Sequence, residues 1–136
     1  MKPEIATNPL QSARLKACGI DPKSADFVWM EGKPNPRLTL RTEIIEDSNP
    51  YIVAYGWSLS ALLTLLPKVV YHDGDMYYLD LAQCFPLTDE YAATYKPAWF
   101  EGDDLFLARD NSPIEACVQL IERLVENGYK LNEVKQ

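Results

Sequence analysis

The stretch over residues 112–128 constrains the fold most, because it specifies one amphipathic helix together with both of its ends. Ser112, Pro113 and Glu115 form the pattern of a capping box: the Ser112 hydroxyl accepts the Glu115 amide proton, and the Glu115 carboxylate bonds back to the Ser112 amide. Gly128 suits the left-handed residue that ends a helix. The face predicted to be buried carries Ile114, Cys117, Val118, Ile121, Leu124 and Val125. The sequence therefore predicts a helix over 113–127 packed on a core.

A second, shorter helix is predicted between Ser58 and Pro67. Ser58 is a good N-cap, and Pro67 stops the helix because it lacks an amide donor and crowds the preceding turn. One face carries Leu59, Leu62, Leu63 and Leu66. A helix this short is not stable alone, so we expect it to be held by packing in the core.

A tight hairpin is predicted over residues 69–81. Asp73-Gly74 fits the two-residue type I′ turn, whose positive φ angles match the twist of paired strands. This turn places His72 opposite Asp75. It also sends Tyr77 and Tyr78 to opposite faces, so both can be buried only if both faces of the sheet are covered.

The N-terminal segment, residues 1–26, is predicted to be helical and loosely packed. Asn8 can cap a helix, Pro9 suits its first position, and Gly19 suits its end. The apolar positions at helical spacing are few, namely Leu10, Ala13 and Ala17. Asp21 followed by Pro22 suggests a second short turn.

The remaining segments favour strands. Residues 27–30 and 37–45 are separated by a loop rich in Gly and Pro, and residues 98–100 and 105–107 are separated by the polar turn 101–104. With 47% hydrophobic residues, the 136-residue chain can bury a core as one domain over 1–136. We therefore expect an α+β fold, in which a small antiparallel sheet of hairpins packs against two or three helices.

Composition excludes several classes of partner and site. The chain has 13 basic and 20 acidic residues and a net charge of −7, so direct binding to nucleic acid or to anionic membranes is not expected. The apolar stretch 51–71 is broken by polar residues, Gly56 and Pro67, which argues against a membrane span. Three scattered cysteines suit neither a disulfide framework nor a zinc site, and we expect a reducing, cytoplasmic location.

No motif indicates an enzyme or a cofactor, and the sequence contains no phosphate-binding glycine loop. The only histidine, His72, could in principle activate Cys84 as a nucleophile, but the hairpin register separates the two by tens of Å, on the order of 3.3 Å per strand residue. A polar pair of His72 with Asp75 beside the turn is favoured instead. We assign no catalytic, cofactor-binding or metal-binding residue.

The surfaces left unexplained by folding are the tyrosine-rich hairpin and the acidic turn after it. Tyrosine is common at the energetic centres of protein interfaces, which suggests that this region meets a partner or a second copy. The candidate interaction surface comprises Tyr71, His72, Asp75, Tyr77, Tyr78, Glu101, Asp103 and Asp104.

Two stretches resemble a known family. The strings W-S-L-S-A-L-L-x-L-L-P over Trp57–Pro67 and N-S-P-I-E-A-C-x-x-L-I-E-x-L over Asn111–Leu124, with the tyrosine-rich hairpin between them, resemble small uncharacterised proteins of prophages and mobile elements in anaerobic gut bacteria. The resemblance covers the C-terminal 80 residues or so. It implies an accessory role for such an element and identifies no site residue.

Three functional hypotheses follow. The first is a non-enzymatic accessory protein that binds another protein or itself. The second is an acidic mimic of nucleic acid that inhibits a DNA-binding protein, and the third is a small metal-dependent hydrolase that uses carboxylates as hard oxygen ligands. The second requires one surface to carry Asp73, Asp75, Glu101, Asp103, Asp104 and Asp110.

Overall fold

The computed structural model describes residues 4–47, 49–84 and 86–133, and in these ranges it has three α-helices and two antiparallel sheets. The helices are α1 (Pro9–Ala17), α2 (Leu59–Leu65) and α3 (Pro113–Glu126), and short 3-10 turns lie at Pro22–Ser24 and Arg41–Glu43. One sheet has the order β2-β1-β3, formed by β1 (Phe27–Met30), β2 (Arg37–Leu40) and β3 (Ile52–Gly56). The other has the order β4-β5-β6-β7, formed by β4 (Val69–His72), β5 (Asp75–Gln83), β6 (Tyr91–Pro97) and β7 (Leu105–Asp110).

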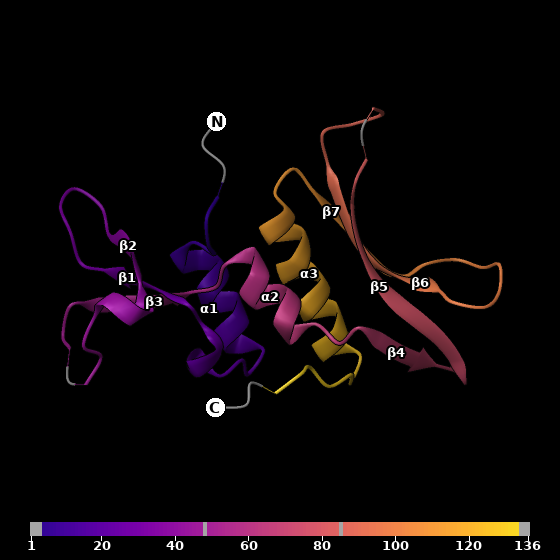
Figure 1. Ribbon diagram of the computed structural model, residues 1–136, viewed down its shortest axis with the longest axis horizontal. Helices are drawn as coiled ribbons and strands as arrows, with labels where there is room; N and C mark the ends of the chain where they lie inside the picture. Colours follow the sequence, from indigo (N-terminus) through magenta and orange to yellow (C-terminus); the bar gives the residue numbers. More distant parts are fainter. Residues whose placement is uncertain (1–3, 48, 85, 134–136) are drawn as a thin grey trace.

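The helices lie between the two sheets (Figure 1). The four-stranded sheet packs one face against α3, and none of the helices in the described ranges lies on its opposite face. Helix α1 contacts α3 on one side and β3 on the other, which connects the smaller sheet to the rest of the molecule. The predicted α+β fold is confirmed, although its strands form two sheets and not one.

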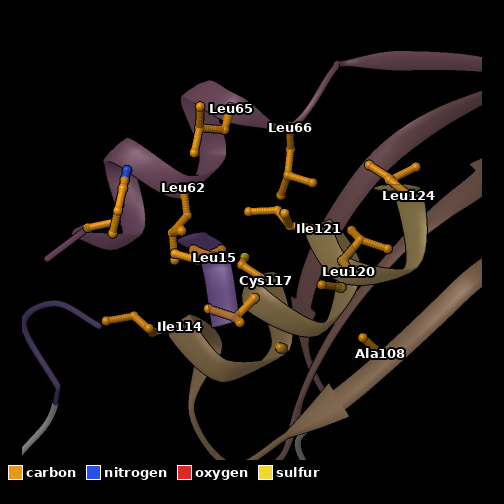
Figure 2. Packing of buried hydrophobic residues seen from close by; sticks show 14 of the residues in the cluster. Leu15, Leu62, Leu65, Leu66, Ala108, Ile114, Cys117, Leu120, Ile121 and Leu124 are labelled. Atoms are coloured by element: carbon orange, nitrogen blue, oxygen red, sulfur yellow. The ribbon is translucent and has the colours of Figure 1, made fainter. Parts of the chain in front are cut away.

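A continuous apolar core joins the helices to the four-stranded sheet (Figure 2). Leu62 of α2 lies next to Leu15 of α1, and Leu66, which follows α2, points toward Ile121 of α3. Leu120 of α3 lies on the side of β7 that carries Ala108, and Leu124 lies one turn further along α3. These leucine side chains are all fully buried. Each contributes roughly 1.5–3 kcal/mol through removal of its apolar surface from water. Among the described residues, no helix combines the length and apolarity needed to cross a membrane.

The ends of α3 confirm one half of the predicted cap and correct the other. The Ser112 hydroxyl accepts the amide proton of Glu115 as predicted, at 3.3 Å. The return bond from the Glu115 carboxylate is absent, because Arg14 occupies that carboxylate and Asp110 accepts the Ser112 amide proton at 2.9 Å. At the other end Gly128 has φ +81°, and the Tyr129 amide donates to the Leu124 carbonyl at 3.0 Å, as in a Schellman motif.

The strand before the acidic turn was predicted in the wrong place. Residues 98–100 do not form a strand; the partner of β7 is β6, which ends at Pro97 and pairs through Tyr95 and Leu105. The sequence of β6 contains Ala, Thr and Lys and shows no alternating pattern, because Ala93, Thr94 and Tyr95 are all buried. The 69–81 hairpin, by contrast, has the predicted register, with His72 opposite Asp75.

Helix α1 begins at Asn8 and ends before Gly19 as predicted, but it buries the opposite face. The predicted apolar positions Leu10, Ala13 and Ala17 are exposed, whereas Gln11, Ser12 and Leu15 are buried. The polar pair is tolerated because each side chain has a partner: the Ser12 hydroxyl bonds the Thr7 hydroxyl at 2.8 Å, and Gln11 donates to Glu115 at 3.0 Å. The segment is thus fixed by polar contacts and by one buried leucine.

Arg14 joins α1 to α3 through two carboxylates. Its guanidinium makes two hydrogen bonds to Glu115, at 2.7 and 3.0 Å, and also pairs with Glu122. Partial burial of Glu115 raises the pKa of its carboxyl, but hydrogen bonds from Arg14, Gln11 and Gln119 outweigh this, and its pKa lies below the usual value. Bidentate charge-assisted bonds of this kind are stronger than ordinary surface ion pairs.

We predict that Arg14→Met destabilises the protein by about 1–2 kcal/mol at pH 7, because Glu115 and Glu122 lose their cation in a partly buried site. Since the folded pKa of Glu115 is depressed, its contribution is present above the unfolded pKa and is lost as the pH falls below about 5. The difference between wild type and Arg14→Met should therefore shrink on acidification.

Urea unfolding at pH 7 and near pH 3 measures both effects. Arg37→Met, which removes an exposed arginine from β2, is the matched control and should leave the midpoint unchanged. An Arg14→Met variant as stable as Arg37→Met at pH 7 would contradict the role given to this contact.

Candidate functional site

The candidate residues from the sequence gather at one end of the four-stranded sheet. The β4–β5 turn and the 98–104 loop between β6 and β7 lie at the same end, because the strands alternate in direction. The Ala98 amide donates to the Met76 carbonyl at 3.0 Å, which ties the start of the loop to the hairpin. The structure therefore brings the tyrosine-rich hairpin and the acidic turn together, as the proposed surface requires.

An aromatic cluster lies on the helix side of this end of the sheet. We define it as His72, Tyr77, Phe100, Phe106 and Tyr129. The rings of Tyr77 and Phe100 meet edge to face at 5.6 Å between centroids, and those of Phe106 and Tyr129 do the same at 5.6 Å. Such geometry is favourable because the positive edge of one ring faces the negative face of the other.

Phe106 enters this cluster through an irregularity in β7. Between the pairs Ala93–Ala108 and Tyr95–Leu105 the register shifts by one residue, as in a β-bulge, and Phe106 has φ +58°. That conformation is uncommon for a bulky residue and costs of order 1–3 kcal/mol. It turns the Phe106 ring toward Tyr129 and under the guanidinium of Arg123, which lies 5.6 Å from the ring centroid. Sequence reasoning missed Phe100, Phe106, Arg123 and Tyr129.

His72 bonds to residues other than the predicted Asp75. Its Nδ1 lies 2.7 Å from the Tyr129 hydroxyl, and its Nε2 lies 3.3 Å from the Asp73 carboxylate. The prediction of an Asp75 side-chain pair is therefore wrong, although Asp75 is the backbone partner of His72. The turn conformation of Asp73, with φ +50°, lets its carboxylate reach back to the ring.

The contacts of His72 place a carboxylate, an imidazole and a phenol hydroxyl in series, from Asp73 through His72 to Tyr129. Here desolvation raises the pKa of Tyr129, and the negative charge of Asp73 raises it further, with a contribution from Tyr77. The phenol therefore stays protonated. Because the Asp73 carboxylate faces Nε2, it favours the neutral tautomer with its proton on Nε2, in which Nδ1 accepts from the Tyr129 hydroxyl. In this geometry the three groups tie the β4–β5 turn to the end of α3.

The other two tyrosines of the candidate surface, Tyr71 and Tyr78, lie on the opposite side of the sheet from the aromatic cluster. We define the outer face as the side of β4–β7 that no helix covers. Cross-strand pairs place Tyr71 beside Met76 and Val69 beside Tyr78 on this face. Tyr71 is 66% exposed and Tyr78 is 42% exposed, while Tyr77 is 8% exposed in the core. The predicted division of Tyr77 and Tyr78 between two faces is confirmed.

The acidic residues of the site are spread around this end of the sheet. Asp73, Asp75, Glu101, Asp103 and Asp104 are all exposed there. Asp110 lies at the far end of β7, where its carboxylate accepts the Ser112 amide proton, so the six acids do not form one row. Among the described residues, no three His, Cys, Asp or Glu side chains are placed to hold a metal ion together.

The three cysteines are free thiols. Cys117 is buried in α3 as predicted, and desolvation raises its pKa to about 12, which makes it unreactive at neutral pH. Cys84 follows β5 at the end of the sheet opposite the His72 turn, and its sulfur accepts a hydrogen bond from Arg109 at 3.5 Å. The structure therefore does not pair His72 with Cys84.

Comparison with known proteins found no matching family model, no similar curated protein and no similar solved structure. Inferences about function therefore rest on the geometry described above.

We predict that Tyr129→Phe changes the tautomer of His72. In the wild type the Tyr129 hydroxyl donates to Nδ1, so the neutral ring carries its proton on Nε2, facing Asp73. Loss of the hydroxyl should produce a mixture of the two neutral tautomers. Imidazole ¹⁵N chemical shifts above pH 8 measure this directly. Tyr71→Phe is the control and should leave the ring unchanged, and a wild-type ring protonated on Nδ1 would contradict the assignment.

Proposed function

We propose that the chain is a protein-interaction module that binds another protein through the outer face of the β4–β7 sheet. The observation that carries the proposal is the apolar character of this uncovered face. An antiparallel sheet with one solvated face usually places polar side chains there. Here Val69, Tyr71, Tyr78 and Leu107 are exposed, with Tyr71 the most exposed of the four.

The charges at the edge of this face indicate the kind of partner. Carboxylates crowd the end of the sheet at the β4–β5 turn and the 98–104 loop, while Asp80 and Lys96 pair with each other at 3.6 Å. A partner with an apolar patch flanked by basic residues complements this arrangement. Two copies of this chain would instead bring like charges together at that end, which disfavours self-association through it.

The anchoring of the hairpin supports the same function. The aromatic cluster and the His72–Tyr129 bond fix the turn from the helix side, so Tyr71 and Tyr78 are presented on a rigid support. Aromatic side chains held in this way lose little conformational entropy on binding, which is why they are frequent at interface centres. The accessory role in a phage or mobile element remains a prediction from the two resembling stretches.

The double variant Tyr71→Thr/Tyr78→Thr tests the proposal. Threonine, like tyrosine, favours a strand conformation but has no ring. The fold should therefore be retained, while binding should weaken at least about tenfold. Tagged full-length protein is used to capture partners from a lysate of cells that carry the gene, and captured proteins are quantified by mass spectrometry.

The control is Leu10→Ser/Ile45→Ser, which removes two exposed apolar side chains from α1 and from the segment between β2 and β3, outside the β4–β7 sheet. A partner retained by wild type and control, but lost from the tyrosine variant and released by salt, supports the proposal. If every captured protein is retained equally by all three proteins, the outer face is not the binding surface.

A further inference from the structure

A second surface lies on the opposite side of the molecule, between α1 and the edge of the small sheet. β3 is an edge strand, with β1 on one side only. Helix α1 runs beside it. Between the two lies a groove with a volume of about 400 Å³, which is within the range of ligand-binding pockets. One wall is formed by Pro9, Ser12, Ala13 and Lys16 of α1, and the other by residues 52–55 of β3.

The groove runs along β3 where the strand is irregular. Residues 52–55 all line it, and the register with β1 shifts by one residue between the pairs Trp29–Ala54 and Met30–Ile52, as in a β-bulge at Val53. The apolar side chain of Val53 is 52% exposed there. An exposed apolar edge of this kind is a template for pairing with another strand.

The backbone of this edge is already paired at one end. The Trp57 amide donates to the Thr7 hydroxyl at 3.0 Å, and the Trp57 carbonyl accepts the Thr7 amide proton at 2.9 Å. Ala6 and Ser58 form a single antiparallel bridge at the same point. The chain then turns into α1 at Asn8, so the short ladder stops where the groove begins.

The next outward-facing groups of the edge belong to Tyr55. Hydrogen-bonding directions alternate along a strand, so the amide and carbonyl of Tyr55 point the same way as those of Trp57, away from β1. Among the described residues, no hydrogen bond from outside the strand ladders reaches them. A peptide in the groove can use these groups and so extend the ladder that Ala6 and Thr7 begin.

The charge of the lining restricts the occupant further. Within the described part of the chain, Lys16 is the only charged residue that lines the groove and no carboxylate lines it, although the sequence has 20 acidic residues and a net charge of −7. Lys16 is exposed on α1. A carboxylate on the bound segment would complement it.

We propose that the groove binds an extended peptide by strand addition to β3, with apolar side chains in the hollow and one carboxylate near Lys16. The free backbone groups of the edge favour a peptide over a fatty acid, which could fill the apolar space but has no main chain to pair with Tyr55. This site is separate from the outer face of β4–β7, so the two proposals succeed or fail independently.

The test uses synthetic acetylated hexapeptides that alternate Val, Ile, Leu or Tyr with Thr, each made with a C-terminal Glu or with a C-terminal Lys amide. They are titrated into ¹⁵N-labelled full-length protein to about 1 mM, which detects even weak binding. Peptides ending in Glu should shift the amide signals of residues 52–55 and 13–16 and slow hydrogen exchange of the Tyr55 amide. They should bind about threefold more tightly than the Lys-amide forms.

Variants on α1 separate the groove from other surfaces. Ala13→Arg fills the hollow and should weaken binding by at least about tenfold, whereas Ala17→Arg, which adds the same side chain to an exposed position outside the lining, should change it less than about twofold. Lys16→Glu should reverse the preference for the Glu-ended peptides. Circular dichroism confirms that each variant is folded.

Three results would overturn the proposal. The first is that none of the hexapeptides shifts the signals of residues 52–55 at about 1 mM. The second is that the peptides bind, but that Ala13→Arg and Ala17→Arg weaken their binding equally. The third is that dodecanoate shifts these signals while no peptide does, which would identify the groove as a site for acyl chains.

Discussion

The contact of Arg14 with Glu115 and Glu122 holds the two ends of the chain together, and much of the architecture depends on it. Residues 14 and 115 are far apart in the sequence, yet their side chains form the main polar link between α1 and α3. Helix α1 in turn meets β3, so the small sheet is attached to the core through a helix whose buried face is partly polar. A buried polar contact with full hydrogen bonding specifies one arrangement of its partners, whereas an apolar face tolerates sliding.

The two faces of the β4–β5 hairpin have different roles: the inner face packs in the core, and the outer face is the proposed binding surface. Val70 and Tyr77 face the core, while Val69, Tyr71 and Tyr78 face outward. The energy that fixes the hairpin comes from the inner face and from the contacts of His72 and Phe106 with Tyr129. The outer residues contribute cross-strand pairs such as Val69–Tyr78 and Tyr71–Met76, and we propose that the apolar surface they leave exposed binds a partner protein.

Local signals in the sequence predict the elements whose ends are set by nearby residues. The turn at Asp73-Gly74, the N-cap at Ser58 and the helix end at Gly128 are each determined by residues within a few positions, and all three are found as predicted. The errors concern distant partners. The Glu115 carboxylate binds Arg14 in place of the expected Ser112 amide. Helix α1 buries Gln11 and Ser12 because Glu115 and Thr7 supply their hydrogen-bond partners. Three successive residues of β6 are buried, so its sequence shows no alternation. The candidate site was located by its hairpin and acidic turn, but Phe106 and Tyr129 reach it through a bulge and a helix end that no local pattern reveals.

The polar docking of α1 also has a consequence for the dynamics of the protein. Proteins open in cooperative segments, and segments with few buried apolar contacts open first. Helix α1 buries one leucine along its length, whereas α2 and α3 bury nine residues between them. Detachment of α1 would remove one wall of the groove beside β3 and expose its full edge, so a ligand spanning both walls would bind only the closed form. Such a ligand would therefore couple occupancy of the groove to the docking of α1 against the rest of the molecule.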